Sequence, residues 1–257
     1  MNETIVFFDI DGTLLDERNR LPQTTKQAIG LLQRSGIRTA IATGRTPSQF
    51  EWIREELNID TYVSANGQYV VYEGREIYAH RLPPDRLRDM CEFAEERGHC
   101  LAFSSHAMLC ASHAAHPLID ASFGALSLEY PPVDPLFYTH SPVYQAYLFC
   151  PVEEEPLYTA RFPEYRYHRW HRLAADVMPA GGSKAVGIQK LLEAVGAAPA
   201  QCYAFGDGLN DKEMLAWVGT GIAMGNASDE VKAVADRVTA TSSEDGIWHG
   251  LKQVGLI

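Results

Sequence analysis

The chain has 257 residues, of which 46% are hydrophobic and 21% are charged, and its formal net charge is −11. This composition is typical of a globular protein with enough core for one large α/β domain or two unequal ones. The negative charge disfavours nucleic acids and anionic membranes as partners. A small phosphorylated metabolite is compatible with it, because a bound divalent cation can reverse the local sign of the charge.

The amino-terminal segment and the cysteines predict a cytoplasmic protein with no membrane partner. The segment "MNETIVFFDI" has neither a basic region nor a cleavage site, and no apolar run approaches the ~18 residues that a membrane span requires. The cysteines are scattered without a Cys-x-x-Cys pair, which indicates reduced thiols. They are Cys91, Cys100, Cys110, Cys150 and Cys202.

The first quarter of the chain alternates between strand and helix. Short apolar runs predict buried strands over residues 4–9, 37–44 and 61–67. Apolar residues at helical spacing predict helices over residues 22–36 and 46–57. This alternation is typical of a parallel sheet whose strands are joined by right-handed crossovers.

The middle and the last third of the chain differ from each other. From residue 83 to 179 the sequence is rich in proline, aromatic residues and histidine, with a predicted helix over residues 84–98 and predicted strands over residues 99–105, 143–150 and 166–178. Beyond it the first pattern returns. The predicted helices there are 182–196, 210–218 and 228–238, the last with Ser228 as its N-cap, and the predicted strands are 201–208 and 220–227.

These elements predict an α/β fold with a doubly wound parallel sheet and an inserted α/β domain. The catalytic core comprises residues 1–82 and 180–257, and residues 83–179 form the inserted domain. Prolines and glycines at residues 82–83 and 179–182 are suited to hinges between the two.

Four aspartates follow strands of the predicted core. Asp9 and Asp11 end the first strand, Asp207 ends a later one, and Asp211 lies one helical turn further on. Ligands of open parallel sheets bind beyond the carboxyl ends of the strands. Carboxylates crowded there repel one another unless a cation intervenes, so we expect a Mg²⁺ site.

Two other strand or helix ends supply groups for an anion. Thr43 and the amide of Gly44 can hold phosphoryl oxygens, and Lys184 at the first turn of a helix can offset carboxylate charge and clamp a phosphoryl group. A carboxylate nucleophile, a second carboxylate, a cation and such a clamp predict phosphoryl transfer through an aspartyl-phosphate. Arg45 has two readings, a contact with substrate or an ion pair with an acid.

These motifs, in this order, resemble those of the haloacid dehalogenase (HAD) superfamily. The matching segments are "DIDGT", "TGR", the lysine of "GSK" and "GDGLND". Further segments resemble its Cof-type branch, which carries an inserted C2B-like α/β cap for substrate specificity: "VSANGQ", "IAMGNASDEVKAVADRVT" and "SSEDGI". The resemblance is close over residues 1–80 and 180–257 and only architectural over the cap.

The resemblance implies a role for each matching aspartate. Asp9 would be the nucleophile and a Mg²⁺ ligand. Asp11 would protonate the leaving oxygen, activate water and lend its backbone carbonyl to Mg²⁺. Asp207 would bind the metal directly, and Asp211 through water or another residue. An aspartate at position 11 indicates a phosphatase or a phosphomutase, because cation-pumping ATPases of the superfamily carry threonine there and dehalogenases lack the acid/base.

The remaining matches imply a phosphate-binding set of Thr43, Gly44, Lys184, Asn210 and Arg45. The sequence thus predicts a Mg²⁺-dependent phosphatase acting on a small phosphomonoester, such as a sugar phosphate or a nucleotide-related metabolite. A phosphomutase and a catalytically silent sensor of a phosphorylated metabolite are the alternatives.

Two segments of the inserted domain have competing interpretations. In "HAMLCASHAAH" the spacing of four side chains is compatible with metal binding: His106, Cys110, His113 and His116. Ordinary structural roles are favoured, because no second pair of ligands accompanies them. "RYHRWHR" interleaves basic and aromatic residues, as nucleic-acid-binding proteins do. On a strand its side chains divide between two faces, which favours a solvated or substrate-facing edge.

Overall fold

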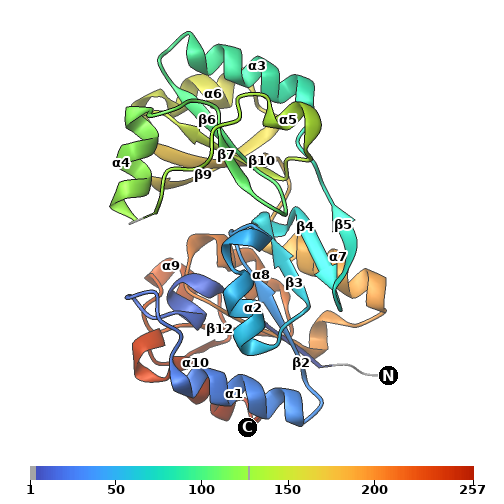
Figure 1. Ribbon diagram of the computed structural model, residues 1–257. Helices are drawn as coiled ribbons and strands as arrows, with labels where there is room; N and C mark the ends of the chain where they lie inside the picture. The colour runs from blue at the N-terminus through green and yellow to red at the C-terminus, as the bar shows by residue number, and fades with distance from the viewer. Residues whose placement is uncertain (1–3, 127) are drawn as a thin grey trace. The chain divides into compact units, whose positions relative to one another are not determined.

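The computed structural model describes residues 4–126 and 128–257, which form two compact units (Figure 1). The first unit contains the chain up to Arg45, then Gln49–Tyr78 and Ser183–Ile257. The second contains Ala79–Gly182 and the tripeptide Thr46–Ser48. The predicted inserted domain, residues 83–179, lies within the second unit.

The first unit is built on a mixed sheet whose strands have the order β13-β12-β11-β1-β2-β3-β4-β5 among the described residues. From β13 to β3 neighbouring strands run parallel, whereas β4 runs antiparallel to β3. The strands are β1 (Ile5–Phe8), β2 (Arg38–Ala42), β3 (Tyr62–Ser64), β4 (Tyr69–Tyr72), β5 (Arg75–Ala79), β11 (Cys202–Gly206), β12 (Thr220–Ala223) and β13 (Arg237–Val238). The predicted parallel α/β core is confirmed, and β4 and β5 are an addition that the sequence did not predict.

Helices flank this sheet. They are α1 (Gln23–Arg34), α2 (Glu51–Leu57), α7 (Lys184–Val195), α8 (Lys212–Trp217), α9 (Asp229–Lys232) and α10 (Gly246–Gln253). The helix predicted over residues 46–57 begins only at Glu51, because residues 47–49 form a 3-10 turn.

The helix predicted over residues 228–238 is wrong beyond Lys232. Asp236 makes two hydrogen bonds to the backbone of Gly221 on β12: its amide donates to the Gly221 carbonyl oxygen, and its side-chain carboxylate accepts from the Gly221 amide at 2.8 Å. These bonds draw the chain into the edge strand β13. Ser228 does precede α9 as its N-cap, but its side chain makes no capping hydrogen bond.

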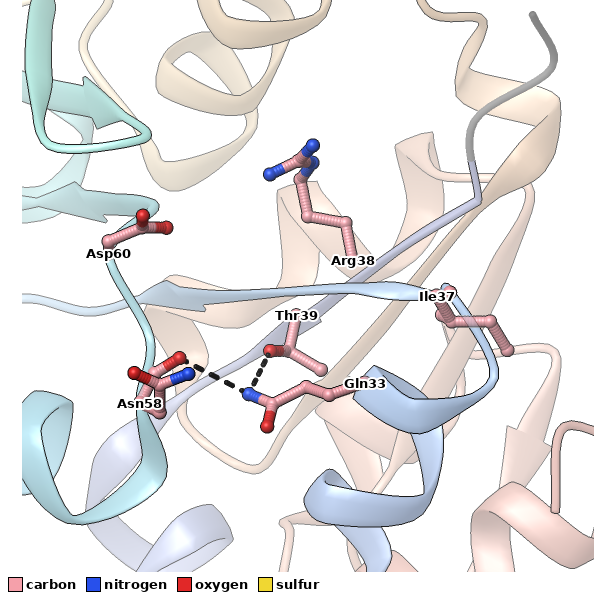
Figure 2. Close-up of a pocket in the computed structure, with 7 residues that line it drawn as sticks. Gln33, Ile37, Arg38, Thr39, Asn58 and Asp60 are labelled. Atoms are coloured by element: carbon pink, nitrogen blue, oxygen red, sulfur yellow. Dashed lines mark hydrogen bonds between the residues drawn. The ribbon is translucent and has the colours of Figure 1, made fainter.

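A polar hollow lies at the amino end of β2, where the strand begins at Arg38 (Figure 2). Gln33 Nε2 crosses it to Thr39 Oγ1 at 3.0 Å and to the carbonyl oxygen of Asn58 at 3.3 Å. None of the predicted site residues lines it. The predicted site belongs to the opposite, carboxyl ends of the parallel strands.

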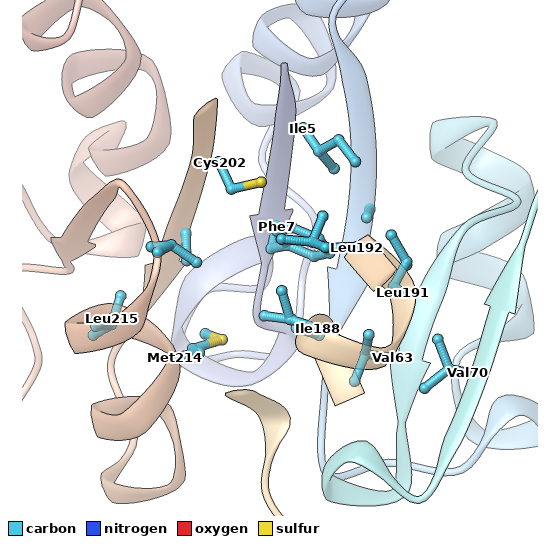
Figure 3. Packing of buried hydrophobic residues seen from close by; sticks show 14 of the residues in the cluster. Ile5, Phe7, Val63, Val70, Ile188, Leu191, Leu192, Cys202, Met214 and Leu215 are labelled. Atoms are coloured by element: carbon cyan, nitrogen blue, oxygen red, sulfur yellow. The ribbon is translucent and has the colours of Figure 1, made fainter. Parts of the chain in front are cut away.

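One face of the sheet is buried by α7 and α8 (Figure 3). Ile5 and Phe7 of β1 point to this face, where Ile188 and Leu191 of α7 and Met214 of α8 pack with them. Strand residues alternate between faces, so their neighbours Val6 and Phe8, also fully buried, point to the other face. A central strand buried on both faces explains the uninterrupted apolar run in the sequence.

The second unit has an antiparallel sheet in the order β7-β6-β8-β10-β9. Its strands are β6 (Cys100–Ser104), β7 (Leu109–Ala111), β8 (Gln145–Phe149), β9 (Tyr165–His171) and β10 (Ala174–Pro179). Its helices are α3 (Pro84–Glu95), α4 (Pro117–Ala125), α5 (Phe137–His140) and α6 (Glu155–Arg161). The single strand predicted over residues 166–178 is a hairpin of β9 and β10, turning between His171 and Ala174.

All five cysteines are free thiols, and all but Cys91 are buried. Burial raises the pKa of each of them, that of Cys91 to about 12 and that of Cys202 to about 11. Within the described residues, no helix has the length and apolar character needed to cross a membrane.

Candidate active site

Asp9 leaves β1 at its carboxyl end, in the middle of the sheet. Its amide donates to the carbonyl oxygen of Phe205 on β11 at 3.0 Å, and its side chain is buried. Gly12 follows with φ of +73°, and a Cβ atom there would lie 2.2 Å from Asp207 Oδ2. Thr13 Oγ1 donates to Asp207 Oδ1 at 2.9 Å. Only glycine fits this turn, which places the first acidic motif against the last.

Asp211 is fully buried one turn beyond β11. Its Oδ2 accepts hydrogen bonds from the backbone amides of Asp207 and Gly208, at 3.0 and 2.9 Å. Its Oδ1 lies 2.6 Å from Nζ of Lys184. Both oxygens of Asp211 therefore fix neighbouring groups of the site, the loop on one side and the lysine on the other.

Lys184 is the first residue of α7 and is also fully buried. The helix begins there because Ser183 caps it, its Oγ accepting from the amide of Val186 at 3.3 Å. Besides Asp211, Nζ contacts Asp9 Oδ1 at 2.7 Å. The Lys184 ammonium therefore lies between two carboxylates, and it contacts only Oδ1 of Asp9, not Oδ2.

The electrostatics of the site show an excess of negative charge. Burial raises the pKa of Asp9 well above its usual value, and the Asp211 carboxylate raises it further while Lys184 opposes the shift. Burial likewise raises the pKa of Asp207 to about 6, against the hydrogen bond from Thr13. Burial alone would lower the pKa of Lys184, but Asp211 and Asp9 more than reverse that effect. One ammonium does not compensate for three carboxylates.

Among the described residues, the acidic, histidine and cysteine side chains that could together hold a metal ion are Asp9, Asp207 and Asp211. Each offers one oxygen, and these oxygens lie within 4.8 Å of one another. An all-carboxylate set suits a hard divalent cation such as Mg²⁺. The raised pKa values of Asp9 and Asp207 show that their charged forms are disfavoured in this site, and a bound cation would stabilise those charged forms. The residues therefore fit this ion. The side chain of Asp11 is not in the group.

Asp11 is instead paired with Arg45. The guanidinium Nε donates to Asp11 Oδ2 at 3.0 Å and Nη2 to Oδ1, a two-pronged contact, while Nη1 reaches the carbonyl oxygen of Gln49 at 3.3 Å. Of the two readings of Arg45, the structure contains the ion pair. Thr43 follows β2, is buried, and its Oγ1 accepts from the Arg45 amide at 3.1 Å. Gly44 lies between them.

Two asparagines that the sequence analysis did not single out contact the predicted site. Asn66 Oδ1 accepts from Asn210 Nδ2 at 3.0 Å. Asn226 Nδ2 donates to Asp207 Oδ2 at 3.1 Å and to the carbonyl oxygen of Gly12 at 2.9 Å. Asn66 lies in "VSANGQ" and Asn226 in "IAMGNASDEVKAVADRVT", two segments that resemble the Cof-type branch. That resemblance was the available sequence signal for these two residues.

Histidine and arginine side chains of the two segments make hydrogen bonds and an ion pair within the second unit. His113 Nδ1 lies 2.8 Å from Ser112 Oγ, and His116 Nδ1 accepts from the amide of Leu118 at the start of α4. Arg169 on β9 is paired with Glu155 at 2.6 Å. These contacts favour ordinary structural roles for the histidines of the first segment, and they place one arginine of the second segment in an ion pair within the unit.

The fold and this arrangement define a class: a Rossmann-like α/β enzyme with an acidic site and a buried lysine at the carboxyl ends of its parallel strands. Residues 6–251 match the family model of the haloacid dehalogenase-like hydrolases. The chain belongs to this family.

Individual relatives agree with this membership. The "Putative phosphatase YkrA" of Bacillus subtilis is 44% identical over 257 residues, covering 100% of both proteins. A crystal structure of a hypothetical protein from Geobacillus kaustophilus has a TM-score of 0.96 at 52% identity and covers 100% of each chain. The HAD subclass IIB sugar phosphatase BT4131 has a TM-score of 0.86 at 31% identity, covering 99% of this chain and 100% of that one. The predicted superfamily and the predicted enzyme class, a phosphatase, are confirmed.

Proposed function

We propose that the protein is a Mg²⁺-dependent phosphatase that hydrolyses small phosphomonoesters through an aspartyl-phosphate on Asp9. The observation that carries this proposal is the contact of Lys184 Nζ with Asp9 Oδ1 at 2.7 Å, beside Asp207 and Asp211. It anchors one oxygen of a buried carboxylate and leaves the other for attack. A nucleophile with a fixed orientation and an adjacent cation is what covalent phosphoryl transfer requires.

The chemistry proceeds in two steps at Asp9. Oδ2 of Asp9 forms a bond to phosphorus while the bond from phosphorus to the ester oxygen breaks, and the protonated carboxyl of Asp11 gives its proton to that leaving oxygen. Water then attacks the phosphorus, Asp11 takes the proton from this water, and the acyl-phosphate bond breaks to release inorganic phosphate and Asp9. We assign both transfers to Asp11 because it lies two residues from Asp9 and its exposed side chain is accessible to water.

Asp9, Asp207 and the backbone carbonyl of Asp11 would hold the Mg²⁺ ion, with Asp211 acting through water or through Lys184. When bound, the ion supplies positive charge that neutralises developing charge on the phosphoryl oxygens. We assign phosphoryl binding to Thr43, the Gly44 amide, Lys184 and Asn210. Arg45 orients Asp11 in this scheme.

The substrate class is that of sugar phosphates and related metabolites. Support comes from the sugar phosphatase among the solved relatives and from the net charge of −11, which selects against polyanionic partners. We assign the second unit as the cap that selects the substrate, and we place the enzyme in the cytoplasm because its five thiols are free.

Replacing the nucleophile tests the proposal. Asp9→Asn should lower the rate of p-nitrophenyl phosphate hydrolysis by at least about a thousandfold, because the amide cannot form the covalent intermediate. Asp16→Asn, a buried aspartate paired with Arg20 rather than with site residues, is the matched control and should retain activity. Mass spectrometry of wild type quenched during turnover should detect a phosphorylated Asp9. Substantial turnover by Asp9→Asn would contradict the mechanism.

A further inference from the structure

Residues 65–67, between β3 and β4, form a turn with an unusual backbone. Ala65, Asn66 and Gly67 have φ of +49°, +51° and +94°. Left-handed conformations are unfavourable for residues with a Cβ atom, and two such residues in succession persist only where their surroundings hold them. Something other than local preference therefore keeps this turn in place.

The backbone of the turn is bound to the loop that follows β2. The amide of Asn66 donates to the carbonyl oxygen of Thr43 at 3.1 Å, and the amide of Ala65 donates to that of Arg45 at 3.0 Å. Both acceptors flank Gly44. The turn thus fixes the loop to which we assign phosphoryl binding.

The same turn packs against the start of α7. A Cβ atom on Gly67 would lie 2.0 Å from the carbonyl oxygen of Ser183, and one on Gly187 would lie 2.7 Å from Gly67 Cα. The backbones approach this closely only because both positions are glycine. The helix that begins with Lys184 therefore rests on the turn.

The side chain of Asn66 makes the third connection. It is buried, its Oδ1 accepts from Asn210 Nδ2 at 3.0 Å, and its amide group lies over Gly44, where a Cβ atom would be 3.1 Å from Nδ2. An acceptor at this point fixes which way the Asn210 amide faces, because only its nitrogen can donate.

We propose that Asn66 is the positioning residue for the phosphoryl-binding loops, holding the Asn210 amide and the Gly44 backbone in the orientation that receives phosphoryl oxygens. This inference rests on the proposed phosphatase function. Asn66 links the loop after β2 to Asn210, while its neighbour Gly67 packs against the start of α7. Groups fixed before the ligand arrives bind it at a lower entropic cost. Removing the amide should therefore weaken phosphate binding more than it weakens the fold.

Asn66→Gly is the sharpest variant, because glycine keeps the left-handed backbone and removes only the side chain. Its KM for p-nitrophenyl phosphate and its inhibition constant for inorganic phosphate should both rise by about tenfold, with kcat changed much less. Asn58→Gly is the matched control: Asn58 has φ of +50° and ends α2 beside the hollow of Figure 2, away from the site. It should leave both constants unchanged.

Asn66→Asp keeps the acceptor oxygen and the shape of the side chain, so phosphate binding can be measured in it even if Asn66→Gly impairs folding. Its charge should weaken phosphate binding further by repelling the anion; because a buried carboxylate also costs stability, phosphate inhibition is measured well below the melting temperature of each variant. Unchanged phosphate inhibition in both variants, or a loss explained wholly by a lower melting temperature, would overturn the assignment of Asn66. Absence of hydrolysis by the wild-type protein would instead overturn the proposed function.

Discussion

At the scale of single residues, the Arg45 and Asp11 pair defines how the proposed acid/base is held. Asp11 is 56% exposed, so little else restricts its carboxylate apart from the two-pronged guanidinium contact. Exposed ion pairs add little to stability, but a fixed fork geometry orients a carboxylate well. The value of this pair therefore lies in orientation.

Arg45→Ala should lower kcat for p-nitrophenyl phosphate by about 10- to 100-fold, because Asp11 would lose its orientation but not its function. Arg45→Lys, which keeps the charge but not the fork, should recover only part of the rate. Steady-state kinetics of both variants beside Asp11→Asn measure this. A rate for Arg45→Ala as low as that of Asp11→Asn, or equal to that of wild type, would contradict the positioning role.

The sequence could place some members of the site and not others. Asp9 and Asp207 end apolar runs, so the geometry of a parallel sheet alone puts them at one edge. Lys184 follows a serine at the start of a helix, and the sequence pattern predicts this position as well. Asn66 and Asn226 act through contacts across the fold, and apart from the family resemblance of their segments no local physical pattern distinguishes them from asparagines in ordinary turns.

At the scale of elements, the inner faces of the second unit bury a histidine. His99, just before β6, is 4% exposed, and its Nδ1 lies 2.8 Å from the hydroxyl of Tyr158 on α6. Its Nε2 lies 3.6 Å from Glu154. Burial lowers the pKa of His99 below 6.5, although Glu154 raises it in part. The folded protein thus holds this ring neutral where the unfolded chain would protonate it.

This histidine should make stability depend on pH. As pH falls through about 6.5 the unfolded chain binds a proton at His99 and the folded protein does not, so unfolding becomes easier toward lower pH. His99→Gln should lose that contribution: its urea midpoint should fall less between pH 7.5 and pH 5.5 than that of wild type. Parallel midpoints for the two proteins across this range would show that His99 does not titrate differently on folding.

Elements were predictable where their own periodicity decided them. The strands of the parallel core and α1, α3 and α7 follow from apolar spacing. The end of α9 and the hairpin of β9 and β10 do not, because long-range pairing determines both. The Asp236 contact with Gly221 draws residues of helical composition into a strand, an override of local preference by tertiary hydrogen bonds.

At the scale of the whole molecule, charge links ligand binding to stability. Three carboxylates lie close together in the first unit and the Lys184 ammonium contacts only two of them, Asp9 and Asp211, while a net charge of −11 adds a general repulsion. A cation that binds the folded state alone stabilises it by mass action. The proposed Mg²⁺ site is therefore open to a measurement that does not involve catalysis.

Mg²⁺ at 100 times its dissociation constant should raise the melting temperature of the wild-type protein by roughly 5–10 °C. EDTA should reverse the shift and abolish hydrolysis of p-nitrophenyl phosphate. Asp207→Asn should respond to Mg²⁺ much less, whereas Asp60→Asn at the opposite end of the strands should respond like wild type. Equal shifts in all three proteins would place the bound Mg²⁺ elsewhere.

The distribution of the buried thiols gives each unit its own reporter of opening. Of the buried thiols, Cys202 lies in β11 of the first unit, whereas Cys100, Cys110 and Cys150 lie in the second. Buried thiols with raised pKa values react slowly until they are exposed. Alkylation kinetics followed peptide by peptide would therefore time the opening of the catalytic sheet separately from that of the inserted unit, with no label added to the chain.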